Sequence, residues 1–173
     1  EPFFQSEFTH ELLKRCYSSY IHTAVETCGN VPWEHIENSL AYLDWMFFDI
    51  KHLKSKKHAE GTGYDNKLIL ENIRRISADF CGRLIFRMTV VPDYNDSEQH
   101  VAELAEFLNA LPGKTKEINL LPIHHLAKEK FKMLGLSYFD KSLKTVSNKK
   151  MESLKTVFKT EGIECYIGDD TPF

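Results

Sequence analysis

The sequence contains no pair of cysteines at the spacing that a metal or iron–sulfur site needs. Its four cysteines stand far apart, at positions 16, 28, 81 and 165, with no Cys-x-x-Cys among them. We therefore expect no metal site in this chain. In a reducing compartment the cysteines are expected to be packing residues or incidental thiols, rather than to form disulfides.

Long apolar runs and an excess of positive charge are also missing. No apolar segment approaches the length that crosses a bilayer, and the first residues, Glu1-Pro2-Phe3-Phe4, do not resemble a signal peptide. The formal net charge is -3, and the lysines are scattered among acids, apart from short clusters such as residues 54–57, which are typical of a solvated helix start. These absences predict a cytoplasmic protein with neither a membrane nor a nucleic acid as its partner.

Little in the composition is typical of linkers or disordered segments. No stretch is rich in Gly, Pro or Ser, and there is no internal repeat. With 42% hydrophobic and 27% charged residues, the chain resembles an ordinary globular protein. We expect residues 1–173 to form a single domain with a sizeable core.

Hydrophobic periodicity alternates between helical and strand-like segments along the chain. Helices are expected at residues 6–19, with Ser6 as the N-cap, at 32–41 and 66–78, from a cap at Asp96 or Ser97 to about 108, and at 149–160. Strands are expected at residues 20–27, 44–50, 83–91, 117–123 and 163–167. Because the strands read as apolar on both faces and alternate with amphipathic helices, the sequence predicts a parallel sheet in an α/β fold.

Polar side chains follow four of these strands at their carboxyl ends, where the loops of a parallel α/β fold converge. The four ends carry residues 26–30 (ETCGN), residues 49–52 (DIKH), Arg87 with residues 93–96 (DYND), and residues 120–125 (LLPIHH). Any one of them could be a capped strand end, but together they present groups of both charges. This pattern favours a pocket for a polar, zwitterionic ligand.

Asp49 and Lys51 are the most distinctive of these groups. They end an apolar strand and stand two residues apart, so their side chains should point to the same face at the same end of the sheet. From this stretch alone two readings are open. The pair is either a salt bridge where the strand meets solvent, or part of a binding site.

The segments at the strand ends belong to a longer series of motifs. Glu1-Pro2 is followed by VETCGNVPWE (25–34), DIKHLKSKKHAEGTG (49–63), ILENIRRI (69–76), FRMTVVPDYND (86–96), LLPIHHLAKEKFKMLG (120–135) and GIECYIG (162–168). As an ordered set, these motifs resemble the activating enzymes of glycyl radical enzymes, the pyruvate formate-lyase activase group of the radical S-adenosylmethionine (SAM) superfamily. Glu1-Pro2 looks like the end of that family's Gly-Gly-Glu-Pro motif, and the resemblance covers essentially the whole chain.

The resemblance implies a partial (β/α) barrel of parallel strands, of the radical SAM type, that holds SAM across the strand ends. Carried over to this chain, Glu1 belongs to the segment that receives the SAM amino group, and Glu26 matches an acidic position near the ribose. Asp49 and Lys51 match an Asp-x-Lys motif that lies against SAM. None of these residues is expected to act as a catalytic acid or base.

Two further SAM contacts are implied on the later strands, at Arg87 and His124. For Arg87 a second reading stays open, a simple ion pair with Glu26 across the barrel. The family pattern of Leu-Leu-Pro, one residue and then a histidine selects His124 for the barrel lumen. His125 is then expected to pack outside or to meet solvent.

The chain departs from the family in ways that bear on the cofactor. The family's cluster-binding Cys-x-x-x-Cys-x-x-Cys loop precedes the Gly-Gly-Glu-Pro motif, and neither that loop nor the first two strands has a counterpart in this sequence. The chain is therefore expected to be the C-terminal part of a longer protein, with a [4Fe–4S] cluster in the full-length protein only, and to be inactive alone. Cys28, Asp93 and Ala127 replace residues that are commonly small, amide or glycine in the family.

The resemblance also implies the chemistry and the partners. In the family, the cluster donates one electron to the SAM sulfonium, and the resulting 5′-deoxyadenosyl radical takes a hydrogen atom from a backbone glycine of a partner. The partners implied are a glycyl radical enzyme, of the pyruvate formate-lyase type, and an electron donor such as flavodoxin or ferredoxin. The protein itself binds, orients and shields the reacting groups.

Other interpretations remain open. In a different barrel enzyme, Lys51 would form a Schiff base with a carbonyl substrate. A truncated barrel would instead be a non-catalytic docking module for a glycyl radical protein. Without the first strands of the family, the predicted strand at 20–27 would have an unpaired edge, which predicts self-association through that edge.

Overall fold

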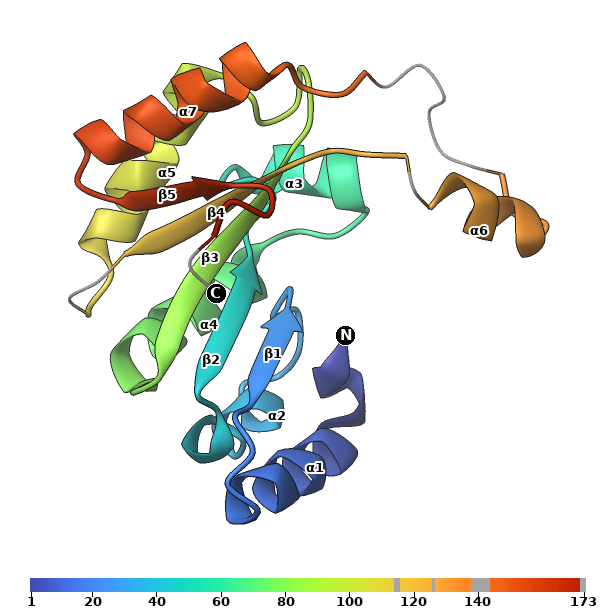
Figure 1. Ribbon diagram of the computed structural model, residues 1–173, viewed down its shortest axis with the longest axis vertical. Helices are drawn as coiled ribbons and strands as arrows, with labels where there is room; N and C mark the ends of the chain where they lie inside the picture. The colour runs from blue at the N-terminus through green and yellow to red at the C-terminus, as the bar shows by residue number, and fades with distance from the viewer. Residues whose placement is uncertain (114–115, 126, 138–143, 172–173) are drawn as a thin grey trace.

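The computed structural model describes residues 1–113, 116–125, 127–137 and 144–171. Five parallel strands form one sheet in the order β1-β2-β3-β4-β5, so that each strand pairs with the next one along the chain (Figure 1). This confirms the predicted α/β fold, and a strand order equal to the chain order is that of a partial (β/α) barrel. The strands are β1 (Ala24–Thr27), β2 (Trp45–Asp49), β3 (Arg83–Val90), β4 (Glu117–Pro122) and β5 (Glu164–Ile167).

Helices connect the strands, and most of them were expected from the sequence. One exception is α6, which buries no residue and so shows no apolar stripe in its sequence. Within the described ranges, no helix combines the length and the apolar character needed to span a membrane. The helical elements are η1 (Pro2–Gln5), α1 (Ser6–Ser18), α2 (Glu34–Glu37), η2 (Leu40–Tyr42), α3 (Ser55–Thr62), α4 (Lys67–Asp79), α5 (Glu98–Ala110), α6 (Lys128–Met133) and α7 (Asn148–Thr160).

The hydrophobic core lies between one face of the sheet and the helices that cover it (Figure 1). Ile69, Ile73 and Ile76 of α4 are at most 5% exposed, as their spacing on one helical face predicts. They share one cluster of buried side chains with Phe48 of β2 and Phe86 of β3. Each such side chain contributes about 1.5–3 kcal/mol when it is fully buried, so apolar packing holds the helices on this face.

The other side of the sheet, which carries Phe47, Asp49 and Arg87, is only partly covered, and we call it the open face. Along β2, Met46 and Phe48 are fully buried on the core side, whereas the residues of the open face are half-buried. The sequence of β2 reads as apolar on both faces, yet the ring of Phe47 lies outside the main core cluster. The open face therefore offers aromatic and charged side chains to a ligand.

Two predicted boundaries near the start of the chain are wrong. Ser6 is the first residue of α1 rather than its N-cap, because η1 runs straight into the helix and Ser6 has helical dihedral angles (φ -57°, ψ -42°). The first strand begins at Ala24 rather than at Tyr20. Tyr20 has φ 57°, and the Ile21 N–H donates to the Cys16 carbonyl at 3.0 Å, which is a Schellman motif that ends α1.

The predicted helix at residues 32–41 is also wrong in its extent. The segment forms the short helix α2 and, after a break, the 3-10 turn η2. Ile36 is the one buried residue of α2, and a helix with so little apolar contact is too weakly stabilised to run further. The lysine cluster at residues 54–57 does start a helix, since α3 begins at Ser55.

Strand β1 forms one edge of the sheet. Within the described residues it pairs with β2 on one side, as the sequence analysis expected. A groove beside its other edge is lined by Phe8 and Leu12 of α1 together with Ala24 and Glu26 of β1. Self-association through this edge stays a prediction.

Candidate functional site

The carboxyl end of β2 brings Asp49 and Lys51 together at the open face. Asp49 is the last residue of the strand, and its Oδ1 lies 3.0 Å from Lys51 Nζ. Lys51 Nζ also donates a 3.2 Å hydrogen bond to Thr89 Oγ1 on the neighbouring strand β3. The prediction that the two charged side chains point the same way is confirmed.

The surroundings of Asp49 make it a strong partner for a cation. Its side chain is 19% exposed. Burial raises the pKa of Asp49, and the nearby Lys51 ammonium opposes this shift by favouring the carboxylate. Because the carboxylate is partly desolvated, a further positive charge placed beside it would be held more strongly than at the protein surface.

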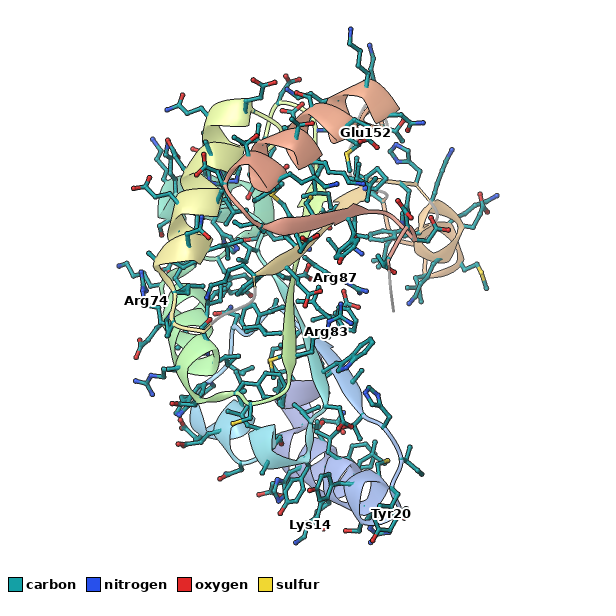
Figure 2. All side chains as sticks on the ribbon, turned by 60° about the vertical axis from the view of Figure 1, so that its left-hand side comes forward. Lys14, Tyr20, Arg74, Arg83, Arg87 and Glu152 are labelled. Carbon is teal, nitrogen blue, oxygen red and sulfur yellow. The ribbon has the colours of Figure 1, made fainter. Side chains whose placement is uncertain are left out.

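Glu26 and Arg87 form a second ion pair beside the first. Glu26 on β1 reaches across β2, so that its Oε2 lies 2.7 Å from Arg87 Nη1, and the guanidinium stands over the Phe47 ring at 4.0 Å from the centroid. Figure 2 shows Arg87 on the open face, above Arg83 of the same strand. The ion pair that the sequence left open as an alternative is thus formed, while contact of either residue with SAM stays a prediction.

Part of the Arg87 guanidinium is left without a partner. Its Nε is buried and has no hydrogen-bond partner among the described residues. Buried polar atoms are usually paired, and an exception marks a strained or functional position. The Glu26–Arg87 pair therefore does not use the full binding capacity of the arginine.

Glu1 is tied to the end of β1. Its Oε1 accepts a 2.6 Å hydrogen bond from Thr27 Oγ1, and its Oε2 accepts a 2.9 Å bond from the backbone N–H of Cys28. Burial opposes ionisation of this carboxyl, but the hydrogen bonds from Thr27 and Cys28 outweigh it and lower the pKa of Glu1. Both carboxylate oxygens hold the strand end, and the chain start is thereby fixed beside the site.

His124 comes after β4, the strand next to the one that carries Arg87. The strand ends at Pro122, and His124 is exposed whereas His125 is half-buried. Because regular strand geometry stops before the two histidines, side-chain alternation does not decide which of them faces the open side. The selection of His124 stays a prediction.

Three buried asparagines hold the loops that leave the strands, and the sequence analysis missed them. Each is at most 2% exposed. The sequence did contain a signal, because Asn72 stands in the apolar stripe of α4, where a polar side chain needs a buried partner. The amide groups donate to backbone carbonyls of the loops after β1 and β2 and, at Thr89, of the end of β3: Asn72 to Gly29 and Val31, Asn66 to His52 and Leu53, and Asn95 to Lys51 and Thr89.

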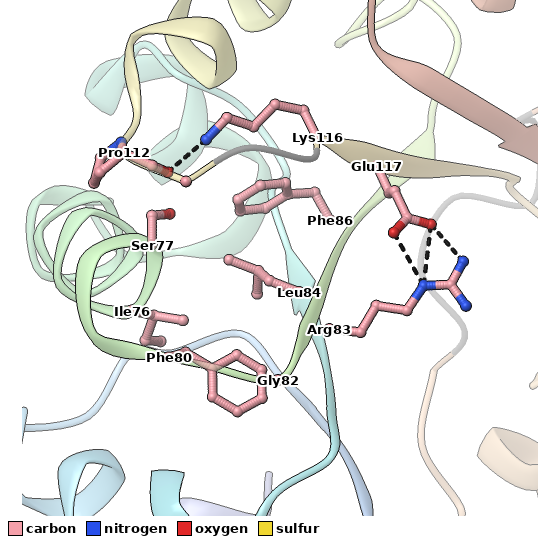
Figure 3. Close-up of a pocket in the computed structure, with 11 residues that line it drawn as sticks. Ile76, Ser77, Phe80, Gly82, Arg83, Leu84, Phe86, Pro112, Lys116 and Glu117 are labelled. Carbon is pink, nitrogen blue, oxygen red and sulfur yellow. Dashed lines mark hydrogen bonds and ion pairs between the residues drawn. The ribbon is translucent and has the colours of Figure 1, made fainter.

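A third ion pair lies at the opposite, amino end of the strands and was also missed. Arg83 of β3 contacts Glu117 of β4 three times, at 2.6–3.2 Å (Figure 3), and its guanidinium lies 4.9 Å from the Trp45 ring centroid. The Glu117 side chain is 8% exposed. A cavity of about 260 Å³ next to this pair is lined by α4, β3 and the turn before β4. At this end of the open face, the arginine is therefore held by two oxygens of a buried carboxylate.

Three departures from the family pattern, at Cys28, Asp93 and Ala127, lie beyond the carboxyl ends of β1, β3 and β4. Asp93 has φ 61°, the left-handed conformation that glycine adopts without strain, at a position where the resemblance implies a glycine. Ala127 has φ -71°, so its replacement of a glycine creates no strain. Cys28 is half-buried, and burial raises the pKa of its thiol.

The residues of this chain fit SAM but not an iron–sulfur cluster. The charged groups of both signs, with an aromatic ring between them, match a ligand that carries a carboxylate, an ammonium and a sulfonium. The four cysteines lie on or next to different elements: α1, β1, the start of β3, and β5. Among the described residues, no group of three or more His, Cys, Asp or Glu side chains could hold a metal ion.

Comparison with known sequences relates the chain to one superfamily. Residues 1–108 match the family description "Radical SAM superfamily". The chain is 40% identical, over 174 residues, to the 4-hydroxyphenylacetate decarboxylase activating enzyme of Clostridium scatologenes, a match that covers 100% of this chain and 55% of the relative. It is 36% identical to the (2S)-3-sulfopropanediol dehydratase activating enzyme of Klebsiella oxytoca, with 97% of this chain and 54% of the relative covered. The chain thus spans about half the length of these relatives.

A solved structure has the same fold over nearly the same length. A domain of the pyruvate-formate lyase-activating enzyme from Bacteroides vulgatus ATCC 8482 superimposes with a TM-score of 0.80 and 29% sequence identity, covering 97% of this chain and 94% of that domain. The strand order, the charged strand ends and these similarities agree with one another. The chain belongs to the radical SAM superfamily, in the group of the glycyl radical enzyme activating enzymes.

Proposed function

We propose that this chain binds SAM at the carboxyl end of its open face and forms part of an activating enzyme that generates a glycyl radical on a partner enzyme. The observation that carries the proposal is the pair of adjacent ion pairs, Asp49–Lys51 and Glu26–Arg87, with spacings of 3.0 and 2.7 Å. A zwitterionic ligand can exchange partners with both pairs, so that no charge is left uncompensated in a partly desolvated site.

Each residue has a binding or orienting role in this proposal. Lys51 and Arg87 supply positive charge to the SAM carboxylate, and Asp49 supplies negative charge to the cationic groups of SAM. Glu26, which is the most exposed member of the two pairs at 51%, lies where it can accept hydrogen bonds from ribose hydroxyls. When SAM is bound and reductively cleaved, it supplies the 5′-deoxyadenosyl radical that takes a hydrogen atom from a glycine.

Glu1 and His124 complete the proposed shell. Both carboxylate oxygens of Glu1 are already used to hold Thr27 and Cys28, so its contribution is to fix the segment that receives the SAM amino group. His124 is exposed beyond β4 and can contact the ligand from the side opposite to β1. No role in electron transfer is assigned to any residue of this chain, because its residues do not fit a [4Fe–4S] cluster.

The partner is proposed to be a glycyl radical enzyme of the 4-hydroxyphenylacetate decarboxylase type. The relative that carries this name is 40% identical across the whole chain, whereas the domain named for pyruvate formate-lyase is 29% identical. The pyruvate formate-lyase type suggested by the motifs is therefore the second candidate. Flavodoxin or ferredoxin remains the proposed class of electron donor.

SAM titration tests the binding step directly. The protein, expressed from its complete reading frame, is titrated with SAM in an anaerobic calorimeter. Loss of a charge-assisted contact should weaken binding at least about tenfold in Lys51→Ala and in Asp49→Asn. Lys56→Ala, which removes an exposed lysine of α3, is the matched control and should bind like the wild type. Wild-type affinity in both site variants would overturn the proposal.

The two histidines after β4 provide a second arm of the same titration. His124→Ala should weaken SAM binding markedly, and His125→Ala should leave it near the wild-type value. Equal effects, or a larger loss for His125→Ala, would show that the assignment at this strand end is wrong.

The partner is tested by electron paramagnetic resonance. The protein from the complete reading frame is mixed with SAM, a reductant and each candidate partner, and the glycyl radical doublet is measured. A doublet on the decarboxylase-type partner is the expected result. A doublet on the pyruvate formate-lyase type alone would correct the partner, and no doublet with either would contradict the proposed activity.

A Schiff-base mechanism is the main alternative for Lys51, and the geometry does not favour it. A Schiff-base lysine needs a free, desolvated amine, whereas Lys51 Nζ is held between Asp49 and Thr89 at 3.0 and 3.2 Å. Borohydride trapping with simple aldehydes, followed by mass spectrometry of the peptide that contains Lys51, should therefore give no specific adduct. A stoichiometric adduct at Lys51 would support the alternative.

A further inference from the structure

Asn95 joins three backbone groups at the carboxyl ends of β2 and β3. Its Nδ2 donates to the carbonyls of Lys51 and Thr89, at 2.9 Å each, and its Oδ1 accepts a 2.8 Å hydrogen bond from the Val91 N–H. The residue is 1% exposed. On the Asn95 side, all three bonds are therefore shielded from water, and the loss of a partner for a shielded polar group is costly.

Two of these backbone groups belong to residues whose side chains touch each other. Asn95 holds the carbonyls of Lys51 and Thr89, and the Lys51 ammonium lies 3.2 Å from Thr89 Oγ1. Lys51 lies beyond the last residue of β2, so the sheet ladder does not define its backbone position. The Asn95 amide takes the place of that ladder, because it joins the end of one strand to the next.

Asn66 and Asn72, which are also buried, hold different parts of the same edge. Asn66 donates to the carbonyls of His52 and Leu53, and Asn72 donates to those of Gly29 and Val31. Within the described part of the chain, the Asn95 side chain is the one that donates a hydrogen bond to the Lys51 backbone itself. The three asparagines are thus similar in burial but differ in the loop they hold, which provides a matched control.

We propose that Asn95 is a positioning residue that sets the place of the Lys51 ammonium between Asp49 and Thr89. Without the Asn95 amide, the segment after β2 can move away from β3, and Lys51 Nζ leaves both of its partners. The significance of this placement for SAM rests on the proposed function, but the placement is a property of the chain itself and can be measured without the cofactor.

Amine labelling reports the position of Lys51 in the protein from the complete reading frame, without SAM. The rate of acetylation by an N-hydroxysuccinimide ester is measured for each lysine by peptide mass spectrometry. Lys51 should react about fivefold faster in Asn95→Ala than in the wild type, in line with the loss of one to two buried hydrogen bonds. Exposed Lys56 serves as the internal standard.

If Asn95 only stabilised the fold, the lysines would be labelled in a different pattern. General loosening would also accelerate labelling of Lys116, whose Nζ donates to two backbone carbonyls, and of Lys155, whose side chain is 17% exposed. We expect both to label at wild-type rates in Asn95→Ala. Asn72→Ala removes a similarly buried amide and should leave the Lys51 rate unchanged. Equal acceleration at Lys51 in both asparagine variants, or none in Asn95→Ala, would overturn the proposal.

A second variant keeps the test decisive if Asn95→Ala does not fold. Asn95→Asp retains the volume of the side chain and the acceptor for the Val91 N–H, and it loses both donors to the Lys51 and Thr89 carbonyls. It should show the same selective acceleration at Lys51, and wild-type labelling in this variant would count against the proposal.

SAM titration separates this proposal from the proposed function. If both hold, Asn95→Ala weakens SAM binding, as Lys51→Ala does. Selective labelling of Lys51 in Asn95→Ala, together with wild-type SAM affinity in Lys51→Ala, would confirm the positioning role and refute the binding role. Wild-type labelling of Lys51 in Asn95→Ala, together with weakened SAM binding in Lys51→Ala, would confirm the binding role and refute the positioning role.

Discussion

An ion pair between an arginine and a glutamate lies at each end of the open face, but the two pairs differ in the number of their contacts and in the exposure of the carboxylate. At the amino end, Arg83 and Glu117 make three contacts at 2.6–3.2 Å, and the carboxylate is 8% exposed. At the carboxyl end, Arg87 and Glu26 make one ion-pair contact at 2.7 Å, and the Glu26 side chain is 51% exposed. An arginine whose hydrogen bonds are satisfied by a buried carboxylate stabilises the fold, whereas one held loosely by an exposed carboxylate remains able to bind a ligand.

The loops add to this contrast. Buried asparagine amides support the segments after β1, β2 and β3 at the carboxyl end. These amides hold the backbone and leave the charged side chains of Asp49 and Lys51 facing the site. A binding site gains from this division, because a rigid backbone positions side chains whose own contacts can be exchanged.

Removal of Glu117 is expected to have the largest effect. Glu117→Ala leaves the Arg83 guanidinium partly buried and without its carboxylate, which should lower the free energy of unfolding by about 3 kcal/mol. Urea denaturation followed by circular dichroism measures the change. A loss below about 1 kcal/mol, as for a surface pair, would show that the two ends do not differ in the way described.

Acid should weaken the carboxyl end through His100. This residue of α5 is 5% exposed and stacks on His52 with ring centroids 4.1 Å apart. Burial lowers the pKa of His100 to about 4; His52 and Lys54 act in the same direction and Glu103 opposes them. Because the pKa of His100 is lower in the folded than in the unfolded protein, the unfolded state takes up the proton first as the pH falls. The contribution of neutral His100 to stability is therefore complete above pH 6.5. It falls by about 2–3 kcal/mol as the pH drops toward 4.

Hydrogen exchange locates this acid effect. The amides at residues 51–54 should lose protection at a higher pH than those at 83–85, which lie at the other end of the open face. His100→Phe, which removes the titrating group, should flatten the dependence of stability on pH between 6.5 and 4. An unchanged slope in His100→Phe would exclude His100 as the cause.

Relief of backbone strain at Tyr20 should have a smaller and opposite effect. Tyr20 has φ 57° and its side chain is 99% exposed, so it adds strain without adding contacts. Tyr20→Gly should raise the free energy of unfolding by about 0.5–1 kcal/mol, after the entropic cost of glycine is subtracted. Tyr20→Ala keeps the Cβ and is the control, with no gain expected in urea denaturation. SAM affinity should not change, because Tyr20 lies before β1, away from the site.

Glu26→Gln should change stability least. The Glu26 side chain is 51% exposed, so water screens its ion pair with the less exposed Arg87 (20%), and such screened pairs contribute about 0–1 kcal/mol. We expect a change within about 0.5 kcal/mol in the same urea assay. A cost equal to that of Glu117→Ala would remove the contrast between the two ends and make Glu26–Arg87 a structural pair.

Much of the fold could be predicted from the sequence because its cause is local. The stripe of Ile69, Ile73 and Ile76 shows a helix that covers a sheet, and all three are buried as expected. The alternation of such helices with apolar strands indicates parallel pairing. The errors fall where local cues are ambiguous, as at Tyr20, which looks like a strand residue but closes α1 in a conformation that glycine usually adopts.

The candidate site was predictable in part for the same reason. Asp49 and Lys51 are two residues apart on one strand, and their contact follows from strand geometry alone. The partners of Asn95 could not be predicted in this way, since its side-chain amide donates hydrogen bonds to residues that are 44 and 6 positions away in the sequence. His124 lies beyond the regular part of β4, where strand geometry no longer predicts the direction of its side chain.

The α/β fold, the order of its elements and the gathering of polar residues at the carboxyl ends of the strands follow from the sequence. Their causes, hydrophobic periodicity and chain direction, are properties of the linear chain. Which charges on different strands form ion pairs was decided by the tertiary structure. Glu26 forms an ion pair with Arg87 across β2, and Arg83 forms one with Glu117 at the amino end of the strands. Such pairs depend on the register between strands that are distant in sequence, and on the burial that makes one pair rigid and leaves the other exchangeable.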